Sequence, residues 1–332
     1  MASRRQGFTL VELMVVTVLM GVLVLGVTRS FTDQKKSANV NDQIAEIQHG
    51  TRLIGALLEE DIRHAGFMVP EPAAVCLVDQ ANAPDSLFVS DASVIEPIDE
   101  IRNDLGARIG GGLTNVANGA QTLDLDTLLL EFTTPDAAYD TDGDGTADSD
   151  FRVNGGVIVA DAGNPSRGTA CGVVTGVTLA GPEIAVTIVS GALGALPATP
   201  DPVDLVAVPA HVYQVTAGMQ LTRDGMLVAD DVEDLQIAVF VDADVDREVD
   251  AGEYRGDGVG ADFDPTAVDA TTIREIRANV ALRTRREDLD NPNGRFQQSE
   301  NRGAVGAADG YRRRVHSSII KLRNVGSRAE TT

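Results

Sequence analysis

The chain begins with MASRRQGFTLVELMVVTVLMGVLVLGVTRSF (residues 1–31), which joins a short basic leader to a long apolar run. From Phe8 to Thr28 the only charged residue is Glu12. At about 1.5 Å per residue, these 21 residues would form a helix about 30 Å long, which matches the hydrocarbon core of a bilayer. The segment is therefore expected to span a membrane once.

Basic residues set the expected orientation of this span. Arg4 and Arg5 favour a cytoplasmic leader with the rest of the chain outside, although Arg29, Lys35 and Lys36 reduce the charge contrast. An ordinary secretory signal peptide has the same outline and is the competing interpretation. A carboxylate costs about 2.5–3.5 kcal/mol at the centre of a membrane helix and less near the interface, so its presence here favours a segment with a further role.

The segment GFTLVE (Gly7–Glu12) resembles the prepilin cleavage and methylation motif of type IV pilins and type II secretion pseudopilins. The resemblance implies that a prepilin peptidase cuts after Gly7, removes residues 1–7 and methylates the new N-terminal residue, Phe8. The helix of residues 8–28 would then remain as the membrane segment and filament core. Cleavage exposes an amine cation in apolar surroundings, where Glu12 of a neighbouring subunit can pair with it and fix the register of assembly.

The helix is expected to continue beyond the membrane segment. No proline occurs before Pro70, and Gly66 followed by Pro70 provides a stop. Residues 29–66 are therefore expected to form the outer half of one long helix, which packs an apolar stripe on a sheet. The stripe consists of apolar residues at helical spacing: Val40, Ile44, Ile47, Ile54, Leu58 and Ile62.

The remaining residues, 67–332, are expected to form a globular, β-rich head. Stretches rich in Val, Ile, Leu and Thr, often alternating with polar residues, are separated by Gly, Asp, Asn and Pro. They are residues 122–132, 172–179, 183–190, 203–208, 234–241, 272–284 and 313–322. The expected fold class is α+β and pilin-like, with a long N-terminal helix on antiparallel sheet and long acidic loops.

The segment RLIGALLEEDIRHAGF (52–67) resembles the end of the long helix in PilW-type minor pilins, which carries an Asp-Ile-Arg-x-Ala-Gly-aromatic run. Residues 228–244 and 312–324 resemble later strands of the same family, and Cys76 follows the helix as a family cysteine does. The J-type pseudopilin of type II secretion shares this general plan and is the alternative.

Residues 140–150 (DTDGDGTADSD) have the start of an EF-hand-like calcium loop. Hard oxygen ligands at alternating positions can surround one Ca²⁺, and Gly145 permits the sharp turn. Position 12 is Phe151 where a bidentate Glu belongs, so the last two acidic residues would complete the shell. The candidate ligands are Asp140, Asp142, Asp144, Asp148 and Asp150.

A second acidic stretch, residues 242–253 (DADVDREVDAGE), ends on the Glu that the first one lacks. Arg247 stands where the loop needs Gly, so its turn would have a different shape. Both stretches could equally be solvated turns, because Asp stabilises turns through its own backbone bonds. The candidate ligands for Ca²⁺ here are Asp242, Asp244, Asp246, Glu248, Asp250 and Glu253.

Cys76 and Cys171 are the only cysteines in the chain. If the head lies outside the cytoplasm, a disulfide between them would close a loop of about 95 residues and stabilise the fold by about 4–5 kcal/mol in the chain-entropy model. Two buried free thiols are the alternative.

Charge and composition exclude several functions. A net charge of −23 disfavours a nucleic acid partner, since phosphate binding needs concentrated Lys and Arg. The sequence has no Gly-x-Ser-x-Gly, HExxH or phosphate-binding glycine loop, so enzymatic activity is not expected.

Taken together, the sequence predicts a minor pilin that primes or caps type IV pilus assembly at the tip by packing of its N-terminal helix. The implied partners are a prepilin peptidase, other major and minor pilins, and the inner-membrane assembly platform. The protein would sit in the inner membrane with its head in the periplasm, and then at the tip of the cell-surface pilus. A minor pseudopilin and a calcium-ordered tip adhesin are the alternatives.

Overall fold

The computed structural model of the chain describes these residues: 9–67, 69–91, 107–109, 115–125, 151–178, 183–191, 193, 203–244, 246, 252–259, 261–288, 290–296, 298–303, 306 and 308–325. The chain divides into two compact units, Met1–Gln48 and His49–Thr332. The second unit is the head, and it takes in the last turns of the helix, whereas the sequence pattern places the start of the head at residue 67.

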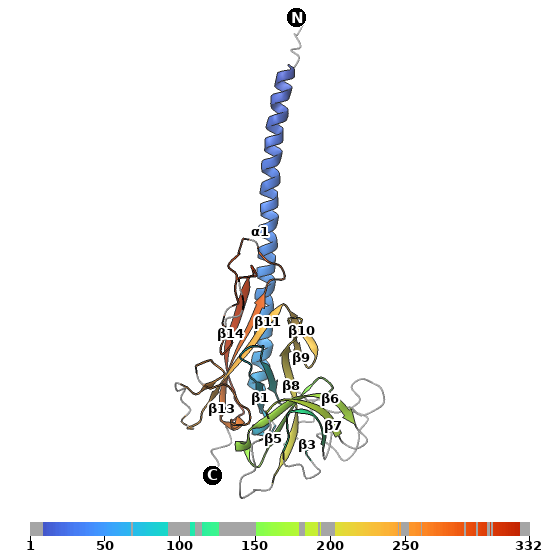
Figure 1. Cartoon of the computed structure of the whole chain (residues 1–332), viewed down its shortest axis with the longest axis vertical. Helices are drawn as coiled ribbons and strands as arrows, with labels where there is room; N and C mark the ends of the chain where they lie inside the picture. Colours follow the sequence, from blue (N-terminus) through green and yellow to red (C-terminus); the bar gives the residue numbers. More distant parts are fainter. Residues whose placement is uncertain are drawn as a thin grey trace. The chain divides into compact units, whose positions relative to one another are not determined.

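The helix α1 runs from Leu10 to His64 without a break (Figure 1). It ends in a left-handed turn at Gly66, whose φ is +79° and whose N–H donates to the carbonyl of Ser90 at 2.9 Å. A residue without a Cβ adopts this conformation at no steric cost, which explains why the helix stops where the sequence predicts.

The larger sheet of the head has ten antiparallel strands in the order β1-β2-β8-β5-β6-β7-β4, while β3 and β9 pair with β8 and β10 pairs with β9. The described residues of the head also include the short 3-10 helices η1 (Glu71–Ala73), η5 (Pro165–Arg167) and η6 (Ala270–Thr272). The strands are β1 (Val75–Val78), β2 (Ser86–Val89), β3 (Ala107–Arg108), β4 (Gly119–Asp124), β5 (Gly156–Asp161), β6 (Thr169–Thr178), β7 (Glu183–Ser190), β8 (Leu205–Val215), β9 (Gln220–Arg223) and β10 (Met226–Asp230).

The smaller sheet has four antiparallel strands in the order β12-β11-β13-β14. They are β11 (Val232–Val241), β12 (Tyr254–Arg255), β13 (Ile273–Arg283) and β14 (Arg313–Lys321). One face of this sheet meets the last turns of α1, where Gly50 lies against Leu282 and Gly55 lies against the ring of His316. Both glycines are in places where a methyl group would have little room, so the helix approaches this sheet closely.

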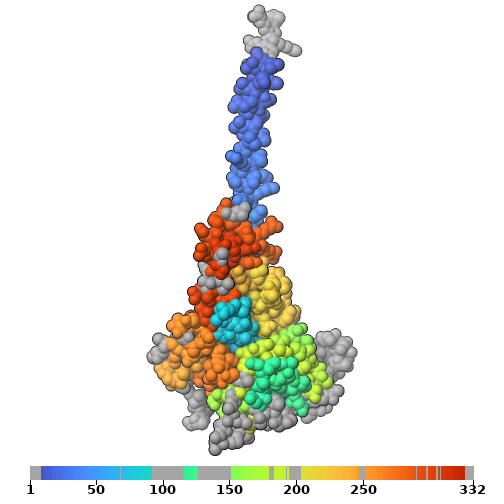
Figure 2. All heavy atoms as spheres, in the orientation of Figure 1, coloured from blue at the N-terminus to red at the C-terminus, as the bar shows by residue number. Residues whose placement is uncertain are grey.

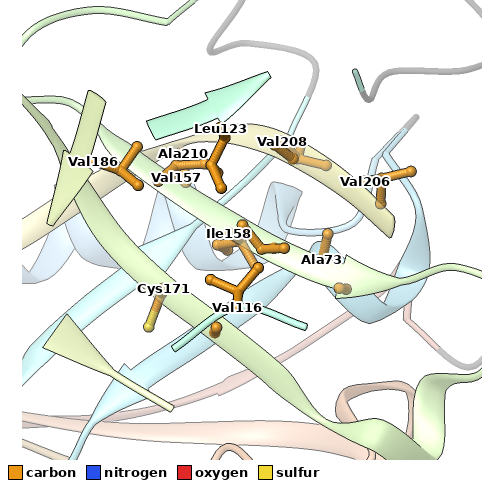
Figure 3. Packing of buried hydrophobic residues seen from close by; sticks show 14 of the residues in the cluster. Ala73, Val116, Leu123, Val157, Ile158, Cys171, Val186, Val206, Val208 and Ala210 are labelled. Atoms are coloured by element: carbon orange, nitrogen blue, oxygen red, sulfur yellow. The ribbon is translucent and has the colours of Figure 1, made fainter. Parts of the chain in front are cut away.

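The core of the larger sheet is aliphatic, as the low aromatic content requires. Val157 and Ile158 of β5 lie in one cluster with Val208 of the adjacent strand β8 and Val186 of β7 (Figure 3). Cys171, in the same cluster, forms a disulfide with Cys76, and the two Cα atoms are 6.1 Å apart. The bridge joins β6 to β1, the first strand after α1, and so cross-links two strands of the larger sheet that are not neighbours in its strand order.

The expected fold class is confirmed, since a long N-terminal helix is followed by an antiparallel β head. The expected stretches within 172–322 correspond to β6, β7, β8, β11, β13 and β14. The following strands lie outside the expected stretches: β1, β2, β3, β5, β9, β10 and β12. Residues 126–132 of the first expected stretch lie outside the described residues.

Candidate functional site

Thr9 and Glu12 form a capping box at the start of α1. The backbone N–H and the hydroxyl of Thr9 donate to Oε2 of Glu12, both at 2.9 Å, and the N–H of Glu12 donates to the Thr9 hydroxyl oxygen at 3.3 Å. These reciprocal bonds satisfy N–H groups that the helix itself leaves unpaired. Gly7 and Phe8 lie outside the described residues, so the cleavage position comes from the sequence alone.

The helix after this box has an exposed, almost wholly apolar surface (Figure 2, blue). Every Leu, Val and Met side chain from Leu10 to Val27 is exposed, and among the described residues α1 is the one helix long and apolar enough to cross a membrane. The hydroxyls of Thr17 and Thr28 donate to carbonyls one turn earlier, so these polar groups are satisfied within the helix. Such a surface needs lipid or other apolar helices around it.

Glu12 is the exception on this surface. Its described hydrogen bonds all come from Thr9, and no described cationic side chain pairs with it. A carboxylate in apolar surroundings needs a compensating charge, and that charge has to come from outside the described chain. The arrangement can therefore hold an amine cation against the helix start.

Comparison with known families agrees with this geometry. The family described as the prokaryotic N-terminal methylation motif matches residues 2–28, which include Gly7, Phe8 and Glu12. The N-terminal segment is thus similar to that of type IV prepilins, and the match covers residues 2–28 of the 332-residue chain. The motif implies processing by a prepilin peptidase and assembly with other pilins, and the apolar helix fits anchoring in the inner membrane. Comparisons with curated proteins and with solved structures gave no match.

A second candidate site is the acidic turn between β11 and β12. Ligand oxygens of Asp242, Asp244 and Asp246 all lie within 4.8 Å of one another. The turn is closed at its base, where the N–H of Val241 donates to the carbonyl of Glu253 at 3.1 Å. Three carboxylates this close repel one another in the absence of a cation, so the turn can hold a hard divalent ion such as Ca²⁺.

The three residues of this turn are not equivalent. Asp242 is buried, and its Oδ2 accepts a hydrogen bond from Nε of Arg274 at 3.0 Å, so part of its charge is already compensated. Asp244 and Asp246 are exposed. Glu248 and Asp250 lie outside the described residues, as do all the candidate ligands of the first acidic stretch: Asp140, Asp142, Asp144, Asp148 and Asp150.

The structure also reveals a polar contact that the sequence pattern did not predict. Asp61, buried on α1, accepts a hydrogen bond from the hydroxyl of Tyr213 on β8 and pairs with Arg223 on β9, with Arg223 Nη2 2.9 Å from Asp61 Oδ2. Burial and the neighbouring Asp61 charge raise the pKa of Tyr213 well above its usual value. Asp61 is the acid of the Asp-Ile-Arg run, so the sequence signalled the residue but not its partners.

Another buried acid fastens the turn between β1 and β2. Both side-chain oxygens of Asp85 accept backbone N–H groups, from Gln80 at 2.7 Å and from Ile237 of β11 at 2.8 Å. Asp85 is fully buried, and desolvation raises its pKa to about 8. Desolvation likewise raises the pKa of Asp234 to about 6, although Arg302 opposes the shift. Asp85 thus links the turn between β1 and β2 of the larger sheet to β11 of the smaller sheet.

Proposed function

We propose that the chain is a minor pilin, of the PilW type, which primes or caps assembly of a type IV pilus through its N-terminal helix. The observation that carries the proposal is Glu12, a lone carboxylate at the start of an exposed apolar helix inside a matched methylation motif. The amine of a processed neighbouring subunit is the cation that fits this position. Pairing of the two groups sets the register of helix packing, so the work of the protein is mechanical.

Processing is tested by N-terminal mass spectrometry of the protein purified from membranes. The expected result is a chain that begins with methylated Phe8. An intact Met1, or cleavage beyond residue 25, would overturn the proposal, because the apolar helix would then be an uncut anchor or a removed signal peptide.

The place of the protein in a filament is tested by deleting its gene. Loss of surface filaments, restored by the wild-type chain, supports a priming role in the pilus. Normal filaments with a loss of protein secretion would assign the chain to a type II pseudopilus instead. The large head suits a low-copy position at the tip better than a repeating position in the shaft, and immunogold labelling of filaments checks this: label at the ends supports the tip, and label along the length contradicts it.

A second function, that of a calcium-ordered adhesin presented on the filament, is favoured by the convergence of Asp242, Asp244 and Asp246. Titration calorimetry of the full chain in detergent should show Ca²⁺ binding in the range of about 10⁻⁴–10⁻³ M. Asp244→Asn should remove the heat that this turn contributes, and Asp142→Ala the heat of the first acidic stretch. If titration with Ca²⁺ produced no heat of binding in the wild-type chain, the proposal that these acidic stretches bind calcium would be wrong.

A further inference from the structure

β14 leaves one edge of the smaller sheet open. It is the last strand of that sheet, and in the described part of the chain only β13 pairs with it (Figure 1, red). With nine residues it is longer than the other strands at sheet edges, β1, β4, β10 and β12, which have two to six residues. A row of unpaired backbone groups of this length can template another strand.

Backbone hydrogen bonds at the two ends of β14 determine which of its residues face the open edge. The N–H of Leu322 donates to the carbonyl of Arg274 at 2.9 Å, and the N–H of Thr284 donates to the carbonyl of Arg312 at 2.8 Å. Such bonds recur at every second residue of an antiparallel pair, so the even-numbered residues of β14 bond to β13. The odd-numbered residues point their N–H and C=O groups to the open edge: Val315, Ser317 and Ile319.

This edge lacks the usual protection against pairing. Natural edge strands are shortened, bulged or interrupted by proline. β14 keeps a continuous register with β13 from Arg313 to Lys321, and its sequence RRVHSSIIK contains no proline. The edge strand β10, by contrast, has a register shift between Leu227 and Ala229. Charge is the one protective device that β14 retains.

The basic side chains along β14 indicate the charge of the strand that could pair with its open edge. His316 faces α1, so alternation places Ile319 and Lys321 on the opposite face, where they are 59% and 80% exposed, although Nζ of Lys321 already pairs with Oε1 of Glu275 at 3.0 Å. Arg314 is exposed as well, and the strand contains no acidic residue. Pairing with a second β14 would bring cations together, whereas an acidic strand would bring opposite charges together.

We propose that the open edge of β14 accepts an extended acidic segment of a different, neighbouring pilin-type subunit as an added strand. The choice of a pilin-type subunit rests on the proposed function, but the recognition itself rests on the backbone of Ser317 and Ile319 and on the cations around them. The main-chain bonds supply affinity, while the exposed Ile319 favours an apolar residue on one face of the added strand and the exposed Arg314 favours an acid on the other.

The probe for this proposal is an acetylated, fluorescein-labelled nine-residue peptide in which valine and glutamate alternate. Fluorescence anisotropy measures its binding to the full chain in detergent. A peptide with lysine in place of glutamate should bind at least about tenfold more weakly. The acidic peptide with every second amide nitrogen methylated keeps the charge but cannot form the ladder, and it should also lose at least about tenfold.

Two variants test the strand itself. Ser317→Pro removes an N–H that points to the open edge and spares the ladder with β13, so it should weaken binding of the acidic peptide by at least about tenfold. Ser317→Ala keeps that N–H and should bind within about twofold of the wild type. Arg323, two residues beyond the end of β14, is exposed like Arg314, and the double variant Arg314→Glu with Arg323→Glu should invert the preference between the acidic and the lysine peptides.

Equal binding of the methylated and unmethylated acidic peptides would overturn the proposal, even if Ser317→Pro failed to fold. So would unchanged binding in a folded Ser317→Pro chain. In cells, Ser317→Cys adds a thiol beyond the bridged pair of cysteines, and a disulfide-linked homodimer through it would identify a second copy as the occupant and contradict the choice of partner. None of the peptide measurements depends on filament formation. A failure of strand addition is therefore distinct from a failure of the proposed pilin function, which N-terminal mass spectrometry of the processed protein tests.

Discussion

Glu12 and Asp61 are two carboxylates on the same helix; Glu12 lies in an apolar stretch of the sequence, whereas Asp61 follows two other acids, Glu59 and Glu60. Asp61 finds its partners within the chain, because Tyr213 and Arg223 of the larger sheet reach it. Glu12 has only the cap from Thr9, and the apolar surface around it is exposed. The difference teaches that the carboxylate in the last turns of α1 obtains its partners when the head folds, whereas the carboxylate in the first turn has to obtain its partner when subunits assemble.

The sharpest way to break this comparison is Glu12→Ala. The substitution should abolish incorporation of the chain into filaments, because the neighbouring amine then has no counter-charge in an apolar environment. The free energy of unfolding of the head should not change. Electron microscopy of filaments and urea unfolding of the purified chain measure the two effects, and Asp33→Asn, an exposed acid on the same helix, should assemble normally.

Asp61→Ala should have the opposite effect, because it should lower the stability of the head. It leaves the hydroxyl of Tyr213 and the guanidinium of Arg223 without their shared partner, and the head should lose about 3 kcal/mol of its free energy of unfolding. Urea denaturation followed by circular dichroism measures the loss. The adjacent, exposed Glu60→Ala should change stability by less than about 0.5 kcal/mol. Equal losses of unfolding free energy in Asp61→Ala and Glu60→Ala would mean that the buried contact of Asp61 does not stabilise the head.

Gly66→Ala tests the left-handed turn that ends α1 and leads into the first strand of the head. A methyl group there meets the left-handed φ of +79° and would lie 3.0 Å from Cγ2 of Val325, so the variant should lose about 2 kcal/mol of stability. Gly303→Ala is the matched control, since no atom lies within 4 Å of its added Cβ. A tolerated Gly66→Ala would show that the end of α1 can shift without cost to the head.

Counted per pH unit, the smallest effect expected is the pH dependence that Asp85 contributes to the stability of the head. Its pKa rises from 3.8 to about 8 on folding, so the folded chain holds a proton that the unfolded chain releases in this range. The contribution of Asp85 to stability should therefore be fully present below about pH 4 and fall by up to about 1.4 kcal/mol per pH unit as the pH rises toward 8. Asp85→Asn should reduce that slope between pH 6.5 and 8, whatever it does to absolute stability, and Asp42→Asn on the exposed helix should leave it unchanged. An unchanged slope in Asp85→Asn would show that the acid is ionised in the fold.

The strands show which secondary structure the local sequence pattern can predict and which it cannot. β13 and β14 follow alternating or β-branched runs, so their existence could be predicted from contiguous residues. β1, β2 and β5 were missed because they are short, with four to six residues, and mostly buried on both sides, which removes the alternation. Their pairing with β8 and β6 is a property of the assembled sheet.

The candidate sites divide in the same way. The acidic stretch at 242–253 is visible in the sequence, but only the folded turn shows that Asp242, Asp244 and Asp246 converge while Asp242 already pairs with Arg274. Two cysteines 95 residues apart leave both pairing and free thiols open, and the packing of β1 against β6 brings them together. The open edge of β14 follows from the strand order, which no segment of the sequence contains.

By itself, the sequence determined the prepilin-like N-terminus, the length of α1 and its end at Gly66, because helix periodicity, capping and the processing motif are encoded in neighbouring residues. Only the tertiary structure decided the partners of Asp61, the burial of Asp85 and the free edge of β14. Those contacts join residues up to 162 positions apart, as in the pairing of Asp61 with Arg223. Their energies depend on a desolvated environment that exists only once the sheets and the helix have packed together.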